Sequence, residues 1–155
     1  MSRPPRPSPL RAALLATAAA SAAACGTDPA PPDAPVSADC LEAESHSDLA
    51  FVQAKILTPG CAAFTSCHQG AATMAGGLNL EAGMARAAMV NKPSAIDPTK
   101  NLVTPGDPAN SYLMIITGKY PGVIDPLVGT MPSRNPLLCA GKLDAMDRWI
   151  AAGAN

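Results

Sequence analysis

Hydrophobic residues recur at helical spacing in two segments, one in the first half of the chain and one at its end. A helix is predicted over residues 47–57, where Ser47 is a suitable N-terminal cap and Pro59-Gly60 is a stop signal. A second helix is predicted over residues 140–152, with Gly153 at its C-terminal boundary. The residues on the two apolar faces are Leu49, Val52 and Ile56, then Leu143, Met146, Trp149 and Ile150.

Two shorter helices are predicted between these segments. Residues 81–90 are rich in Ala and Met, and Gly83 is their one helix breaker. Residues 107–117 begin with Asp107 and Pro108, a cap followed by the residue preferred at the first helical position. The β-propensity of residues 112–117 leaves a strand there as an alternative. The sequence has no run of alternating apolar and polar residues next to hairpin turn residues. The expected fold class is therefore mostly α, with long loops rich in Gly and Pro.

The first 24 residues have the three regions of a secretory signal peptide. Three arginines precede an apolar stretch over residues 12–20, and a run of small residues ends at Ala24. The apolar stretch is far shorter than the ~20 residues needed to cross a bilayer. No later segment has such a run, so the mature chain is not expected to span a membrane.

Cys25 directly follows the small residues, which resembles the lipobox of bacterial lipoproteins. By that resemblance Cys25 becomes the lipid-bearing N-terminus, and Gly26 after it favours the outer membrane, facing the periplasm or the cell surface. The alternative is ordinary cleavage after Ala24, which leaves Cys25 as a thiol. Residues 25–38 are rich in Pro and have no hydrophobic period, which predicts an extended, semi-rigid linker. The folded domain is expected over residues 39–155.

Composition limits what this domain can be. Removal of the leader would leave eight basic and 12 acidic side chains, and no basic stripe that would bind phosphates, so a nucleic-acid partner is not expected. Aromatic residues make up 3% of the chain, which predicts a thin apolar core. Small exported domains often compensate with disulfides or a bound cofactor, and five cysteines allow either.

The candidate chemistry lies at Cys61, Cys67 and His68. A c-type haem needs two thiols that bond to its two vinyl groups and a His directly after the second Cys that binds the iron. The Cys-His pair is present, but five residues separate the cysteines instead of the two in a C-x-x-C-H motif. Both thioether bonds remain possible if the extra residues bulge outward.

Other uses of these residues compete with haem attachment. Cys61 and Cys67 could form a disulfide with each other, and together with Cys40 and Cys139 they allow three pairings. Zinc would lack a second C-x-x-C or H-x-x-x-H pair to complete its tetrahedron. His68 could also be an ordinary exposed polar residue.

From about Phe51 to Ala154 the chain resembles the cytochrome c-like domain of exported bacterial lipoproteins and of larger exported multidomain proteins. The order and spacing of several motifs carry the resemblance. They are Ile56-Leu57 with Cys61 and Cys67-His68, Gly76-Gly77-Leu78-Asn79-Leu80, Val103-Thr104-Pro105-Gly106-Asp107-Pro108 with Ser111 and Leu113, Met131-Pro132, and Trp149-Ile150 with Gly153-Ala154.

The resemblance implies a small α fold whose first and last helices pack across each other beside a haem, with His68 as the proximal ligand and Met131 as the distal ligand. A thioether ligand favours ferrous iron and suits electron transfer. In that architecture Cys40 and Cys139 are close enough to pair, which leaves Cys61 and Cys67 for the haem. If Cys61 pairs with either of them instead, attachment through two thioethers fails.

Three further side chains are candidates for contact with a haem. His46 is an alternative distal ligand, although its place between two serines at a helix start favours a solvated residue. Tyr120 and Arg134 flank the expected distal loop and could bind a haem propionate, although a surface role fits each of them better.

Two functions follow as hypotheses. The first is a membrane-tethered c-type cytochrome that carries single electrons through haem c to a periplasmic or membrane redox protein. The second is a haem-free, disulfide-stabilised lipoprotein of the same fold that serves as a binding or surface-structural module. An enzyme is not expected, because the chain has two histidines and lacks a phosphate-binding Gly-rich loop followed by Lys. Peroxidase-type activity would become possible if Met131 left the sixth iron position open.

Overall fold

The structure is a computed structural model that describes residues 36–155. The expected signal peptide over residues 1–24, the lipidation site Cys25 and most of the linker lie outside the described residues. Within residues 36–155 the chain forms α-, π- and 3-10 helices, two isolated β-bridges and no β-strand, which confirms the predicted helical class. No helix in this range is long and apolar enough to cross a membrane.

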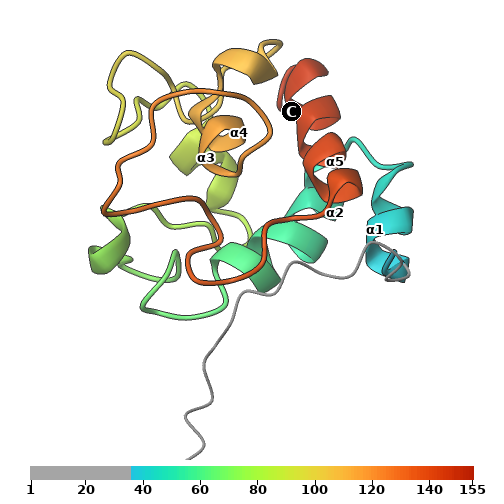
Figure 1. The fold of residues 1–155 in the computed structure, drawn as a ribbon, viewed down its shortest axis with the longest axis horizontal. Helices are drawn as coiled ribbons and strands as arrows, with labels where there is room; N and C mark the ends of the chain where they lie inside the picture. Colours follow the sequence, from blue (N-terminus) through green and yellow to red (C-terminus); the bar gives the residue numbers. More distant parts are fainter. Residues whose placement is uncertain (1–35) are drawn as a thin grey trace, which may run out of the picture. The chain divides into compact units, whose positions relative to one another are not determined.

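Long loops join the helices, and the segment between α4 and α5 is the longest of them (Figure 1). The elements are α1 (Ala38–Ala43), α2 (Leu49–Val52), the π-helix η1 (Gln53–Cys61), the 3-10 helix η2 (Thr73–Ala75), α3 (Ala85–Met89), the 3-10 helix η3 (Pro108–Asn110), α4 (Tyr112–Ile116) and α5 (Ala140–Ala151).

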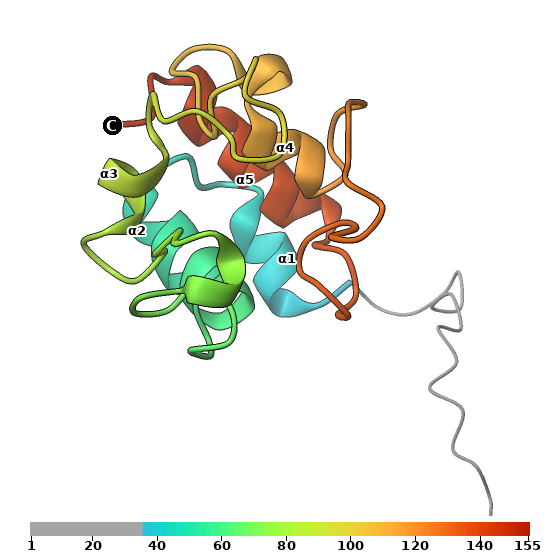
Figure 2. The same cartoon turned by 90° about the vertical axis from the view of Figure 1, so that its left-hand side faces the viewer.

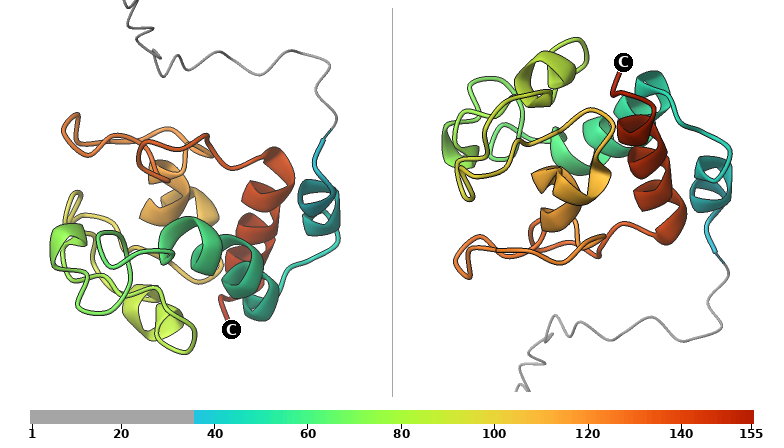
Figure 3. Two further views of the ribbon diagram at one scale, coloured as in Figure 1. Left: turned by 90° about the horizontal axis from the view of Figure 1, so that it is seen from below. Right: turned by 90° about the horizontal axis from the view of Figure 1, so that it is seen from above.

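The C-terminal helix α5 is the element against which the others pack. It contacts α1, α2 and α4, and both views of Figure 3 show it between α1 on one side and α4 on the other. The structure confirms the predicted helix over residues 140–152 as α5, and α2 contacts it. The buried residues of α5 are Gly141, Ala145, Met146, Trp149 and Ile150.

Buried apolar residues form two clusters, and α4 contributes to both. Leu113 and Met114 of α4 join the larger cluster, which also takes side chains from α2, η1, α3 and α5. Tyr112, Ile115 and Ile116 form the second cluster with partly buried residues of the neighbouring loops. All five residues of α4 are buried, so this short helix is held by packing on all sides rather than by its length.

The helix predicted over residues 47–57 differs at both ends. Asp48, and not Ser47, caps it, because its carboxylate accepts a hydrogen bond from the Phe51 amide at 2.8 Å. The helix also does not stop before Pro59 but continues as the π-helix η1 to Cys61. A wider turn lets the chain pass Pro59, whose ring clashes in an α-helix with the carbonyl four residues earlier. Cys61, the first cysteine of the candidate haem motif, therefore lies at the end of a helix.

The two internal helices are shorter than predicted. Gly83 has a positive φ of 84°, and α3 begins only at Ala85. Asp107 and Pro108 start η3 as expected, but Ser111 is extended and separates η3 from α4. The buried Ser111 hydroxyl donates to the Asp107 carbonyl at 2.8 Å and accepts from the Thr104 amide at 2.9 Å, which interrupts the helix. The strand alternative for residues 112–117 is wrong.

Helix α1 was not predicted from the sequence. A disulfide joins it to the start of α5. Cys40 in α1 pairs with Cys139, the N-cap residue of α5. This is the pairing that the family resemblance implied. Figure 2 shows α1 beside α5, at the point where the described chain begins.

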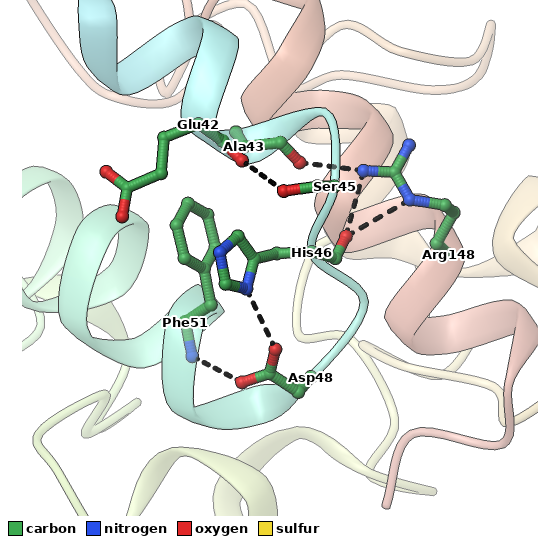
Figure 4. A network of polar contacts seen from close by, with 7 residues as sticks. All are labelled: Glu42, Ala43, Ser45, His46, Asp48, Phe51 and Arg148. Atoms are coloured by element: carbon green, nitrogen blue, oxygen red, sulfur yellow. Dashed lines mark hydrogen bonds and ion pairs between the residues drawn. The ribbon is translucent and has the colours of Figure 1, made fainter.

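Arg148 makes a second attachment between α5 and the segment that precedes α2 (Figure 4). Its guanidinium donates to the carbonyl oxygens of Ala43 at 2.7 Å and of His46 at 2.8 and 3.1 Å. The His46 ring stacks on Phe51 with 4.0 Å between ring centroids, and its Nδ1 lies 3.2 Å from Asp48. His46 is therefore part of a helix start and is partly exposed, as the sequence favoured.

Because α1 lies close to α5, we predict that one methyl group added at Gly141 lowers the stability of the domain. A Cβ at Gly141 would collide with the carbonyl oxygen of Cys40. We expect Gly141→Ala to lower the free energy of unfolding by about 1–3 kcal/mol, because backbone must move to admit the methyl. Thermal and urea unfolding measure this. Gly60→Ala is the matched control, since a Cβ there meets nothing within 4 Å. Equal stability of the two variants would contradict the close approach.

Removal of the disulfide provides a second test of this end of the domain. The two cysteines are 99 positions apart in the sequence, so the bond closes a long loop. We expect Cys40→Ser with Cys139→Ser to reduce the free energy of unfolding by about 2–5 kcal/mol, chiefly because the unfolded chain gains freedom. Urea titration of the oxidised protein measures it, with Cys67→Ser as the control. A double variant as stable as the control would show that the cross-link contributes nothing.

Candidate functional site

Cys61, Cys67 and His68 lie in one short closed loop that begins where η1 ends. The His68 amide donates to the Cys61 carbonyl at 3.1 Å, and the Cys67 amide donates to the Phe64 carbonyl at 2.9 Å. Residues 63–66 are exposed, and the Phe64 side chain is 67% exposed. The extra residues between the cysteines thus bulge outward, and the backbone brings the two ends of the loop together despite the long gap.

The thiols of Cys61 and Cys67 form no disulfide within residues 36–155, and both are partly buried. The Cys40–Cys139 bond accounts for the other two cysteines of the described range. Burial raises the pKa of the Cys61 thiol to about 11, and the neighbouring Cys67 adds to the shift. Cys61 is therefore protonated at neutral pH.

His68 has a fixed ring orientation. Its Nδ1 lies 3.1 Å from the carbonyl oxygen of Leu78, and a carbonyl can only accept, so Nδ1 carries the proton and the Nε2 lone pair is available. Burial lowers the pKa of His68, while the hydrogen bond to Leu78 acts in the opposite direction. The neutral imidazole that results is the form that binds a metal.

A pocket of about 320 Å³ lies beside this loop, a size in the range of small-molecule sites. One part of its lining comes from the end of η1 and the Cys-His loop, and the other from the segment that leads into α5. Its lining residues are Pro59, Gly60, Ala63, Phe64, Cys67, Pro132, Asn135, Pro136, Leu137, Leu138 and Lys142. Cys67 thus faces the pocket, whereas Cys61, His68 and Met131 are not among the lining residues.

Met131 lies on the loop between α4 and α5, where its amide donates to the Ile116 carbonyl at 2.8 Å. Its side chain packs against the second apolar cluster, which Tyr112, Ile115 and Ile116 form. The next residue, Pro132, lines the pocket together with Cys67. The structure therefore brings the Met-Pro loop to the pocket but places the Met131 side chain in the apolar cluster.

Tyr120 has a structural role at this loop. Its hydroxyl donates to Asp147 of α5 at 2.6 Å, and the adjacent Lys119 pairs with Asp144. These contacts attach the start of the long loop to α5. Arg134 is exposed, with a positive φ of 57°. Neither side chain lines the pocket. The surface role favoured from the sequence holds for Arg134, whereas Tyr120 is partly buried and packs against both apolar clusters.

Two features of the site were missed in the sequence. The first is the Leu78 carbonyl, which lies in a recognised motif but acts through its main chain, so its side chain gives no signal. The second is the Tyr112 hydroxyl, which has no hydrogen-bond partner within the described residues although the side chain is 1% exposed. A buried hydroxyl without a partner is unfavourable, and this one lies in the cluster that contains Met131.

The donor set fits a c-type haem better than a zinc ion. In residues 36–155 no three His, Cys, Asp or Glu side chains are grouped to hold a metal ion. A haem brings four nitrogen ligands of its own, so the protein needs to supply only axial ligands and thiols. A neutral His with Nε2 available and two thiols in the same loop supply these donors, and of the three residues only Cys67 lines the adjacent pocket.

Comparison with family models, curated proteins and solved structures gives no match. The functional conclusion therefore rests on the motifs of the chain and on the geometry described above.

Proposed function

We propose that this chain is a membrane-tethered, cytochrome c-like lipoprotein that carries single electrons through a covalently bound haem. The observation that carries the proposal is the closed loop in which Cys61, Cys67 and a neutral, oriented His68 occur together beside a pocket. A haem bound there supplies the one-electron couple between ferric and ferrous iron.

Each residue of the loop has a role in this proposal. The thiols of Cys61 and Cys67 would hold the haem through thioether bonds to its two vinyl groups. Nε2 of His68 would bind the iron, and the Leu78 carbonyl keeps the His68 ring in place. The exposed Phe64 and the pocket-lining Leu137 and Leu138 supply apolar contacts.

Met131 is the proposed distal ligand. Its side chain would have to leave the cluster around Tyr112 to reach the iron, while the bond of its amide to the Ile116 carbonyl can keep the main chain in place. Its thioether sulfur is a neutral, soft ligand that stabilises ferrous iron.

The proposed setting is outside the cytoplasm. Lipidation at Cys25 would hold the protein at the outer membrane, and the Cys40–Cys139 disulfide suits an oxidising compartment. The partner would be a periplasmic or membrane redox protein. We propose electron transfer rather than an enzymatic reaction, and electron transfer needs no substrate site.

Haem attachment is tested by expression of the full chain in a bacterial host with the machinery for periplasmic haem attachment. We expect a coloured protein whose haem stays bound after denaturation, because thioether bonds are covalent. Cys61→Ala with Cys67→Ala should release the haem on denaturation, whereas His46→Ala should keep it. Pyridine haemochrome spectra and mass spectrometry measure both. A colourless wild-type protein, from a host that matures a known cytochrome c, would favour the haem-free, disulfide-stabilised module.

The distal ligand is tested separately in the haem-loaded protein. We expect Met131→Ala to abolish the weak red absorption band that sulfur-to-iron charge transfer produces, and to lower the reduction potential, because ferrous iron loses its soft ligand. Met84→Ala is the control, since Met84 is 53% exposed. A spectrum of Met131→Ala that matches the wild type would exclude Met131 as a ligand.

A further inference from the structure

Residues 78–81, here called the strap, contact His68 at two points. The Leu78 carbonyl accepts from Nδ1 of the His68 ring at 3.1 Å, and the Leu80 amide donates to the His68 carbonyl at 2.8 Å. The first bond sets the ring and the second sets the main chain that carries it. The position of the strap therefore determines which nitrogen of His68 is free.

Gln53 connects the strap to η1. Its side-chain Nε2 donates to the Leu80 carbonyl at 2.9 Å and to the Thr58 hydroxyl oxygen at 3.0 Å. The amide group has two N–H donors, and these two contacts use both. Gln53 is only half-buried, but its bond to Leu80 spans 27 positions of the sequence. The same helix ends at Cys61, so one rigid element presents a cysteine and holds the strap.

Glu81 holds the other end of the strap. Its Oε2 accepts from the Gly70 amide at 3.1 Å and from the Asn79 side chain at 3.0 Å. The Asn79 side chain in turn accepts from the Glu81 amide at 2.9 Å. Gly70 is two residues after His68, so the strap is attached to the chain on both sides of the His68 contact. The Leu80 side chain packs in the larger apolar cluster, and Gln53 provides the side-chain hydrogen bond that joins the strap to a separate element.

We propose that Gln53 is a positioning residue that acts through the strap to keep His68 in its Nδ1-protonated tautomer, with Nε2 free to bind a ligand. Loss of the amide donor leaves the Leu80 carbonyl without this partner and lets the strap move away from the ring. The imidazole then loses a fixed acceptor at Nδ1 and divides between its two tautomers. The consequence for iron rests on the proposed function: a weaker bond at Nδ1 makes Nε2 a poorer electron donor.

The first experiment does not require haem. Nitrogen-15 NMR of the imidazole ring in the haem-free full chain reports the tautomer of His68 directly. We expect one predominant Nδ1-protonated form in the wild type and a mixture of tautomers in Gln53→Met, which keeps the side-chain length but donates no hydrogen bond. Gln53→Glu is a second variant with the same expected shift. Thr58→Val is the matched control, because it removes the other contact of the same amide and should leave the tautomer unchanged.

Three outcomes of this experiment would overturn the proposal. They are an Nε2-protonated His68 in the wild type, an unchanged tautomer in folded Gln53→Met and Gln53→Glu, and unfolding of both variants. The last outcome would make Gln53 a stability residue. Circular dichroism establishes which variants fold.

The second experiment uses the haem-loaded protein. We expect Gln53→Met to raise the reduction potential relative to the wild type, because a less electron-rich imidazole stabilises ferric iron less, whereas Thr58→Val should leave it unchanged. Equal potentials in all three proteins would overturn the link between Gln53 and the iron. If no protein takes up haem, the proposed function fails, while the NMR result still decides the positioning role.

Discussion

The disulfide between Cys40 and Cys139 closes most of the described domain into one covalent loop. It spans 99 positions, and all the loops that form the candidate site lie inside it. In a chain-entropy model a loop of this length contributes roughly 4–5 kcal/mol. Phe64 is exposed and Tyr120 only partly buried, so aliphatic side chains make up most of the buried core. Gly141 and Arg148 add to the closure, since one lets α5 approach Cys40 and the other binds two carbonyls before α2.

The same pairing determines what the remaining cysteines can do. Cys40 and Cys139 bind each other, and Cys61 and Cys67 form no disulfide in the described part of the chain, so both keep their thiols. The π-helix η1 delivers Cys61, the outward bulge absorbs the additional residues, and the bond between the His68 amide and the Cys61 carbonyl closes the loop. An unusual spacing in the sequence is thus compatible with a compact arrangement in space.

Much of the helical pattern could be predicted, and the errors have local causes. The periodic face of α5 was strong enough to define it, because Trp149 and Ile150 are buried where the helical spacing put them. The predicted helix over residues 47–57 continues past Pro59 in the structure. A stop at Pro59 assumes α-helical geometry, whereas a π-helix can contain the proline. The break at Ser111 depends on its hydroxyl, which binds the main chain of Thr104 and Asp107, and a disulfide joins α1 to α5. Neither contact leaves a periodic signal.

The available chemistry can be read from the amino-acid sequence: the adjacent Cys67 and His68, the Met-Pro pair at residue 131 and the candidate partners of each thiol. How these groups are arranged depends on the fold. It selected the Cys40–Cys139 pair, placed the Met131 side chain with Tyr112, and set the protonated nitrogen of His68 through the Leu78 carbonyl. Disulfide pairing and main-chain hydrogen bonds depend on the distances between segments in the folded chain, which side-chain identity and spacing do not encode.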